Sequence, residues 1–142
     1  QKQQYCANLS SNNISTNYAI SLSELYTMQA ECLARKGDVA GAASLLTELR
    51  KNRMEPGHES IPETIVTSDQ MTVFAFEERM REQLGFGSSW FDMKRLWNDP
   101  LFQDLKQYYV HPVGKETYTL TEERLKMKIP PTVIAWHPDY EN

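Results

Sequence analysis

Two carboxylates four residues apart, Glu78 and Glu82, are the side chains whose spacing is most suggestive of chemistry. On a helix they share one face, and glycosidases use paired carboxylates as acid and base. However, Arg79 and Arg81 flank the pair, and a nearby guanidinium keeps a carboxylate ionised, whereas a general acid needs a raised pKa. We therefore do not expect catalysis here. Two interpretations remain: a solvated charged face, which spacing alone favours, or an inward-facing set of ion pairs.

Other reactive residue types are scattered. His58, His111 and His137 are far apart without ligand spacing, which favours surface or hydrogen-bonding roles over metal binding. Cys32 fits a small buried residue of a helix, and a disulfide with Cys6 requires an oxidising compartment. The chain has no glycine-rich phosphate loop and no nucleophile elbow. We expect a protein that is not an enzyme and has no cofactor or metal.

Aromatic residues suggest a different chemistry, because flat rings serve as apolar platforms for sugars. The candidates for such platforms lie in the C-terminal half, and we favour the alternative that they pin irregular chain onto helices. Trp90 and Trp97 fit core positions beside Met93. The candidates for ligand binding are Tyr108, Tyr109, Trp136 and Tyr140, with Tyr118 as a further tyrosine of this half.

Composition fits one globular domain. The chain has 142 residues, 40% of them apolar and 11% aromatic, which is too apolar for a disordered chain. Its formal net charge of −4 argues against a nucleic-acid binder. Uncharged apolar runs are only a few residues long, which is too short to span a bilayer.

The elements that must position these residues begin with a helical hairpin. Ser21 and Glu24 form a capping box that predicts a helix start, with Ile20 and Leu25 as its hydrophobic staple, and Gly37 predicts its end. Asp38 caps the next helix. Two helices joined by a short Gly-Asp corner predict an antiparallel hairpin like one tetratricopeptide unit. The expected apolar face of the first helix contains Leu22, Leu25, Tyr26, Cys32 and Leu33.

Further elements follow the hairpin. Residues 54–67 read as a loop, and Thr67 with Gln70 forms a second capping box that opens a helix ending near Gly85. Ser89 is the expected cap of a short fourth helix to Trp97. We expect a mostly α fold with an irregular lead-in over 1–20 and a single domain over 21–142, helical over 21–97 and loop-rich over 98–142. Alternating apolar residues predict an extended segment over 125–129.

Three blocks of this sequence, in order and in register, resemble SusD/RagB proteins, and together they cover about residues 22–140. The first resembles the family's helical hairpin, the second its Glu-Arg-x-x-Glu and Trp-Phe-Asp signature, and the third its closing Ile-Pro and Asn-Pro pattern. The matching positions are Ala30, Glu31, Arg35, Gly37, Asp38, Ala42, Leu49, Arg50 and Arg53, then Glu78, Arg79, Glu82, Gly85, Gly87, Trp90, Phe91, Asp92 and Arg95, then Ile129, Pro130, His137 and Pro138.

The resemblance implies a nutrient-binding lipoprotein of the bacterial outer membrane in Bacteroidota. Such proteins capture a glycan or other nutrient at the cell surface and deliver it to a TonB-dependent, SusC-like transporter. Family members run several hundred residues, so we expect this chain to correspond to the C-terminal part, with the lipid anchor upstream. The competing interpretation is a helical-hairpin module that binds only proteins.

The chain departs from the family pattern at several positions. Phe86 stands where the pattern has Glu, and Ser89 where it has Arg. Val133 and His137 likewise replace a common Glu and Asn. From the matching family positions we predict that Glu82 and Arg95 form a partly buried ion pair between the third and fourth helices. The signature residues Glu78, Arg79, Glu82, Trp90, Asp92 and Arg95 are thus expected to be structural.

Overall fold

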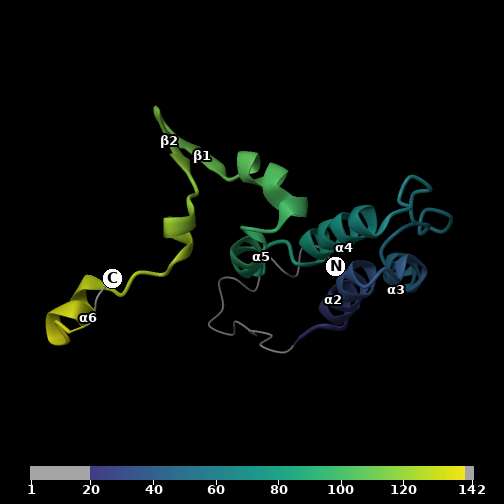
Figure 1. Cartoon of the computed structure of the whole chain (residues 1–142), viewed down its shortest axis with the longest axis horizontal. Helices are drawn as coiled ribbons and strands as arrows, with labels where there is room; N and C mark the ends of the chain where they lie inside the picture. Colours follow the sequence, from purple (N-terminus) through teal and green to yellow (C-terminus); the bar gives the residue numbers. More distant parts are fainter. Residues whose placement is uncertain (1–19, 140–142) are drawn as a thin grey trace, which may run out of the picture.

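The computed structural model describes residues 20–139, apart from the side chain of Tyr108, and is mostly helical, as predicted (Figure 1). The predicted lead-in, Cys6 and Tyr140 therefore lie outside the described residues, Ile20 excepted. No helix in the described range is long and apolar enough to cross a membrane. The elements are α2 (Leu22–Arg35), α3 (Val39–Lys51), α4 (Ser68–Glu82), α5 (Ser89–Leu96), the 3-10 helix η2 (Pro100–Tyr108), β1 (Val110–Val113), β2 (Glu116–Thr119), the 3-10 helix η3 (Glu122–Leu125) and α6 (Pro131–Trp136).

Local signals place the α2–α3 hairpin where the sequence predicts it. The amide of Glu24 donates to Ser21 Oγ at 3.1 Å, and the amide of Gly41 donates to Asp38 Oδ1 at 2.8 Å, so both helices start at a side-chain cap. Gly37 adopts a φ of 89° between them, which a residue with a Cβ adopts at a cost. The capping box is half formed, because the Glu24 carboxylate accepts from Arg79 on α4.

The predicted apolar face of α2 is largely wrong, although Leu33 does pack against the core. Leu22 is 65% exposed, and Leu25 and Cys32 are exposed as well, so Cys32 is not the buried residue that we expected. The helix packs against α3 and α4 through small or compact side chains. Small side chains let the neighbouring backbones approach closely, and the larger apolar side chains on the opposite face are left outside. The buried residues of α2 are Thr27, Ala30, Glu31 and Ala34.

The main core lies where α4 crosses the hairpin. The predicted capping box at the start of α4 is complete, since Thr67 and Gln70 bond each other's backbone amides. Phe76 on α4 is buried, while Met80 near its end and Leu84 beyond it are exposed. The apolar core draws on all three helices. It consists of Ala30 and Ala34 from α2, Ala42 and Leu46 from α3, and Met71, Phe74 and Ala75 from α4.

A second, smaller core joins α4 to the segment after α5. The ring of Phe76 meets that of Phe102 on η2 edge-on, with centroids 5.0 Å apart, and Leu96 completes the cluster. The cap of α5 is Ser88, one residue before the predicted Ser89, and its side chain makes no capping hydrogen bond. The helix is instead entered through a turn with positive φ at Gly85 and Gly87.

The C-terminal half contains short elements, and the segment predicted as extended over 125–129 forms no strand. β1 and β2 pair antiparallel, with Val113 opposite Glu116 across a turn that holds Gly114 at a φ of 62°. Leu125 instead ends η3, and residues 126–130 adopt no regular element. Alternation over three apolar residues does not make a strand where no partner backbone is aligned with it.

Residues 110–139, which we call the C-terminal arm, extend away from the helices (Figure 1). Every residue of β1 and β2 is exposed. Within these residues Leu125 is the one buried side chain, and η3 contacts α5. The helical part of the molecule therefore has its own core, and the arm is attached to it mainly at η3.

Candidate functional site

Arg79 lies at the junction of three helices. Its Nε donates to Asp92 Oδ2 on α5 at 2.9 Å, and its Nη2 donates to Glu24 Oε1 on α2 at 3.2 Å. Arg79 is 8% exposed and Asp92 2% exposed, so this pair is screened from water. The position of Asp92 one turn into α5 brings its carboxylate back toward α4.

The ion pairs continue from Asp92 to the far end of α2. Arg95 Nε donates to Asp92 at 2.8 Å, and both Nη atoms of Arg95 donate to Glu31, at 2.8 and 2.7 Å. Arg35 then joins Glu31 at 3.0 Å to Asp99 at 2.7 Å. We call the set Glu24, Arg79, Asp92, Arg95, Glu31, Arg35 and Asp99 the Arg79 network.

Glu31 is held ionised within this network. Its burial alone would raise the pKa, but the hydrogen bonds and positive charges of Arg95 and Arg35 outweigh burial and hold the pKa of Glu31 below its ordinary value of 4.5. The carboxylate thus acts as a fixed acceptor for two guanidinium groups. It is suited to holding helices together and not to giving up a proton near neutral pH.

The other two acids of the signature bind α3 and the turn after it. Glu78 accepts from Arg50 and Arg81, and Arg50 also donates to the backbone carbonyls of His58 and Glu59 in the following loop. Glu82 accepts both Nε and Nη2 of Arg53, at 2.9 and 3.1 Å. Burial of Glu78 and Arg79 in ion pairs is what an inward-facing cluster requires, whereas Arg81 is exposed.

The predicted Glu82–Arg95 pair is wrong. Glu82 at the last turn of α4 meets Arg53 beyond α3, while Arg95 on α5 turns to Glu31 on α2. The prediction failed because it considered only the third and fourth helices. It did not include the α2–α3 hairpin, on which or next to which the true partners lie. Arg50 and Arg53, three residues apart, recur at about one helical turn, as do Glu78 and Glu82, four residues apart, and this pairing could have indicated the true partners.

The aromatic candidates are not gathered in one place. Tyr109 stacks on Trp97 with ring centroids 6.4 Å apart. The pKa of the Tyr109 hydroxyl is raised, mainly by burial and to a lesser extent by the nearby negative charge of Asp92. Trp136 is 81% exposed on α6, which lies far from η2 (Figure 1). Trp90 is half-buried. Tyr140 and the side chain of Tyr108 lie outside the described part of the chain.

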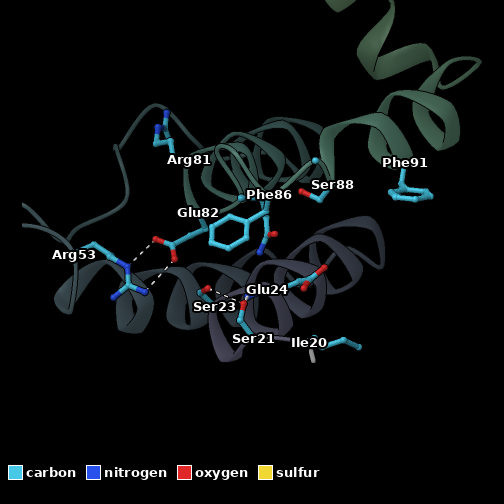
Figure 2. Close-up of a pocket in the computed structure, with 12 residues that line it drawn as sticks. Ile20, Ser21, Ser23, Glu24, Arg53, Arg81, Glu82, Phe86, Ser88 and Phe91 are labelled. Atoms are coloured by element: carbon cyan, nitrogen blue, oxygen red, sulfur yellow. Dashed lines mark hydrogen bonds and ion pairs between the residues drawn. The ribbon is translucent and has the colours of Figure 1, made fainter. Parts of the chain in front are cut away.

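A cleft of about 870 Å³ opens beside the Arg79 network, and sequence analysis did not predict it. Its walls come from the start of α2, Arg53 after α3, the last turn of α4, the α4–α5 turn and the first residues of α5 (Figure 2). We call it the α4–α5 cleft. Its volume falls in the range of small-molecule sites, about 300–1,000 Å³. It combines ionised groups, hydroxyls and two exposed phenylalanine rings.

Among family models, that of the SusD family matches residues 3–137. No curated protein and no solved structure matches the chain. Within residues 20–139 the structure places no three histidine, cysteine or acidic side chains where they could hold a metal ion.

Proposed function

The chain belongs to the SusD family, whose model matches nearly its whole length, and on this premise we propose that it binds a nutrient, a glycan, at the outer-membrane surface. The family match over residues 3–137 is the observation that carries this proposal. SusD-family proteins are binding proteins associated with the outer membrane, and they are not enzymes. We therefore assign this chain a capture role without a catalytic step.

The geometry supports capture over catalysis. The acids that could act as an acid–base pair are each engaged by arginine: Glu78 by Arg50 and Arg81, and Glu82 by Arg53. A carboxylate beside a guanidinium is a poor general acid. By contrast, a rigid helical scaffold with an open cleft beside it suits a binding protein, because a pre-formed site loses little entropy when it takes a ligand.

Two further parts of the proposal concern the delivery of the glycan and the place where the protein is held. We propose that the bound glycan passes to a TonB-dependent, SusC-like transporter and that the protein is held at the cell surface by a lipid anchor. Both follow from the family resemblance. The exposed C-terminal arm offers surface for a contact with such a partner, since Val110, Val113 and Trp136 are exposed there.

A second candidate function is a protein-interaction module without a small ligand. The observation that favours it is the apolar face of α2, where Leu22, Leu25 and Met28 are exposed at successive turns. An exposed apolar stripe of this kind is typical of a surface that packs against another helix.

A glycan array probed with the 142-residue chain tests the proposal. We expect saturable binding to at least one oligosaccharide class, confirmed by a change in the intrinsic fluorescence of the tryptophans on titration. Absence of binding to every glycan, together with saturable capture of a purified SusC-like transporter, contradicts the nutrient-binding proposal and favours the interaction module.

A further inference from the structure

We propose that the α4–α5 cleft is a subsite for a neutral sugar unit of an oligosaccharide, with the ring of Phe86 as its stacking platform. This inference rests on the proposed glycan binding and adds where the sugar lies and what charge it carries. It uses a residue outside the aromatic candidates of the C-terminal half.

The turn between α4 and α5 presents Phe86 to solvent. Phe86 is 72% exposed at the centre of this turn, and it lines the cleft. Gly85 and Gly87 on either side have φ values of 85° and 76°, a conformation that disfavours other residues, so the tight turn that carries Phe86 depends on both glycines. Figure 2 shows the ring between Glu82 and Ser88 over the cleft.

The exposed ring of Phe86 presents an apolar face on which a ligand can stack. The CH groups of one face of a sugar ring form an apolar patch, and an aromatic face is a suitable partner for it. Phe91, also exposed, lies on α5 at another edge of the same cleft and offers a second apolar surface (Figure 2). A sugar chain can therefore extend from one ring toward the other.

The charges of the cleft indicate a neutral ligand. Each charged group that lines it is engaged within the protein: Arg53 with Glu82, Glu24 with Arg79, and Arg81 with both Glu77 and Glu78. An anionic or cationic ligand would have to displace one of these partners and leave it unpaired. A neutral ligand avoids that cost.

Polar groups for sugar hydroxyls are present in the same walls. The Glu82 carboxylate, fixed by two bonds from Arg53, retains lone pairs, and Ser21 Oγ lies 3.1 Å from Ser23 Oγ. Ser88 also lines this wall, but its Oγ is buried without a hydrogen-bond partner among the described residues, so it is not one of the groups that a ligand hydroxyl reaches.

Phe86 also distinguishes this chain from the pattern that it resembles, which has Glu at this position. A glutamate there would add a negative charge to the cleft and remove the platform. The subsite is therefore a feature of this chain's own sequence.

The test is calorimetric titration of the 142-residue chain and its variants with maltohexaose, cellohexaose, mannohexaose and a hexamer of galacturonic acid. For the neutral probe that binds best we expect Phe86→Ala to lose about tenfold in affinity and Phe86→Tyr to retain it. Leu84→Ala is the matched control, because Leu84 is 83% exposed in the same turn but does not line the cleft. We expect its affinity to stay within about twofold of the parent chain.

Each contrary outcome has a distinct meaning. If a glycan binds and Phe86→Ala binds it as well as the parent chain, the subsite is wrong while the proposed function stands. If the galacturonate hexamer binds best and Phe86→Ala weakens it, the neutral class is wrong. If the parent chain binds none of these probes and no glycan on the array, the subsite and the proposed function both fail. Because Phe86 is exposed, the alanine variant should unfold at the same denaturant concentration as the parent, which circular dichroism verifies.

Discussion

Arg79 connects more of the molecule than any neighbouring side chain in the Arg79 network. Its guanidinium reaches Asp92 on α5 and Glu24 on α2 from a position on α4. A third nitrogen, Nη1, is buried without a partner among residues 20–139. Arginine suits this position because its planar fork donates in several directions at once, which a lysine ammonium at the end of a flexible stem does not match.

Loss of this side chain should be costly. Arg79→Ala leaves Asp92 buried with only Arg95 as a cationic partner, and breaking a buried pair from one side typically costs about 3–5 kcal/mol of unfolding free energy. Urea denaturation followed by circular dichroism measures the change. Lys51→Ala is the control, since the Lys51–Glu48 pair is exposed and should contribute less than about 1 kcal/mol. Equal effects of the two substitutions would contradict the buried role of Arg79.

At the scale of elements, two helix starts differ in a way that can be measured. Asp38 caps α3 with a hydrogen bond to the amide of Gly41, so Asp38→Ala should lose about 1 kcal/mol of unfolding free energy. Ser88 occupies the corresponding position of α5 without such a bond and with a buried, unpartnered hydroxyl. We therefore expect Ser88→Ala to be neutral or stabilising. Thermal or urea unfolding of both variants distinguishes the positions, and a loss at Ser88 as large as that at Asp38 would reveal a cap that the structure lacks.

The helix ends were predictable because their causes are local. A serine, aspartate or threonine satisfies amides within three residues of itself, and Gly37 or Gly85 allows a positive φ whatever the rest of the chain does. The same holds for the hairpin of α2 and α3, which follows from two caps and a short corner. The mostly α class could therefore be predicted from the sequence.

Features that depend on the neighbours of an element were not predictable in this way. α2 carries apolar residues on more than one face, and only the positions of α3 and α4 decide which is buried. The partners of Glu82 and Arg95 depend on the same placement. The β1–β2 hairpin did have a local signal, a two-residue turn at Gly114 between Val113 and Glu116, which Pro112 obscured.

At the scale of the whole molecule, stability is divided unevenly. α2, α3 and α4 surround a shared core, whereas both strands of the C-terminal arm are exposed on every residue. A two-stranded hairpin without a packed face is marginal in water. The arm contacts α5 through η3, where Leu125 is buried.

Hydrogen exchange followed by mass spectrometry should detect this division. We expect the amides of β1 and β2 to exchange at least about 100-fold faster than those of α4, because opening the hairpin exposes little apolar surface while opening α4 disrupts the core. Peptides from η3 should be intermediate. Equal protection of β1, β2 and α4 would mean that the arm is packed on a surface, contrary to the fold described.

The Arg79 network also limits how this sequence can change over time. Glu31 and Asp92 each accept from two arginines, so replacing either acid removes one counterion from two arginines at once. Replacing Arg95 likewise removes one cationic partner from both acids. Tolerated variation at these positions should therefore arise as compensated exchanges, in which opposite charges are gained or lost together. A sequence that changes only one partner of a pair should fold poorly.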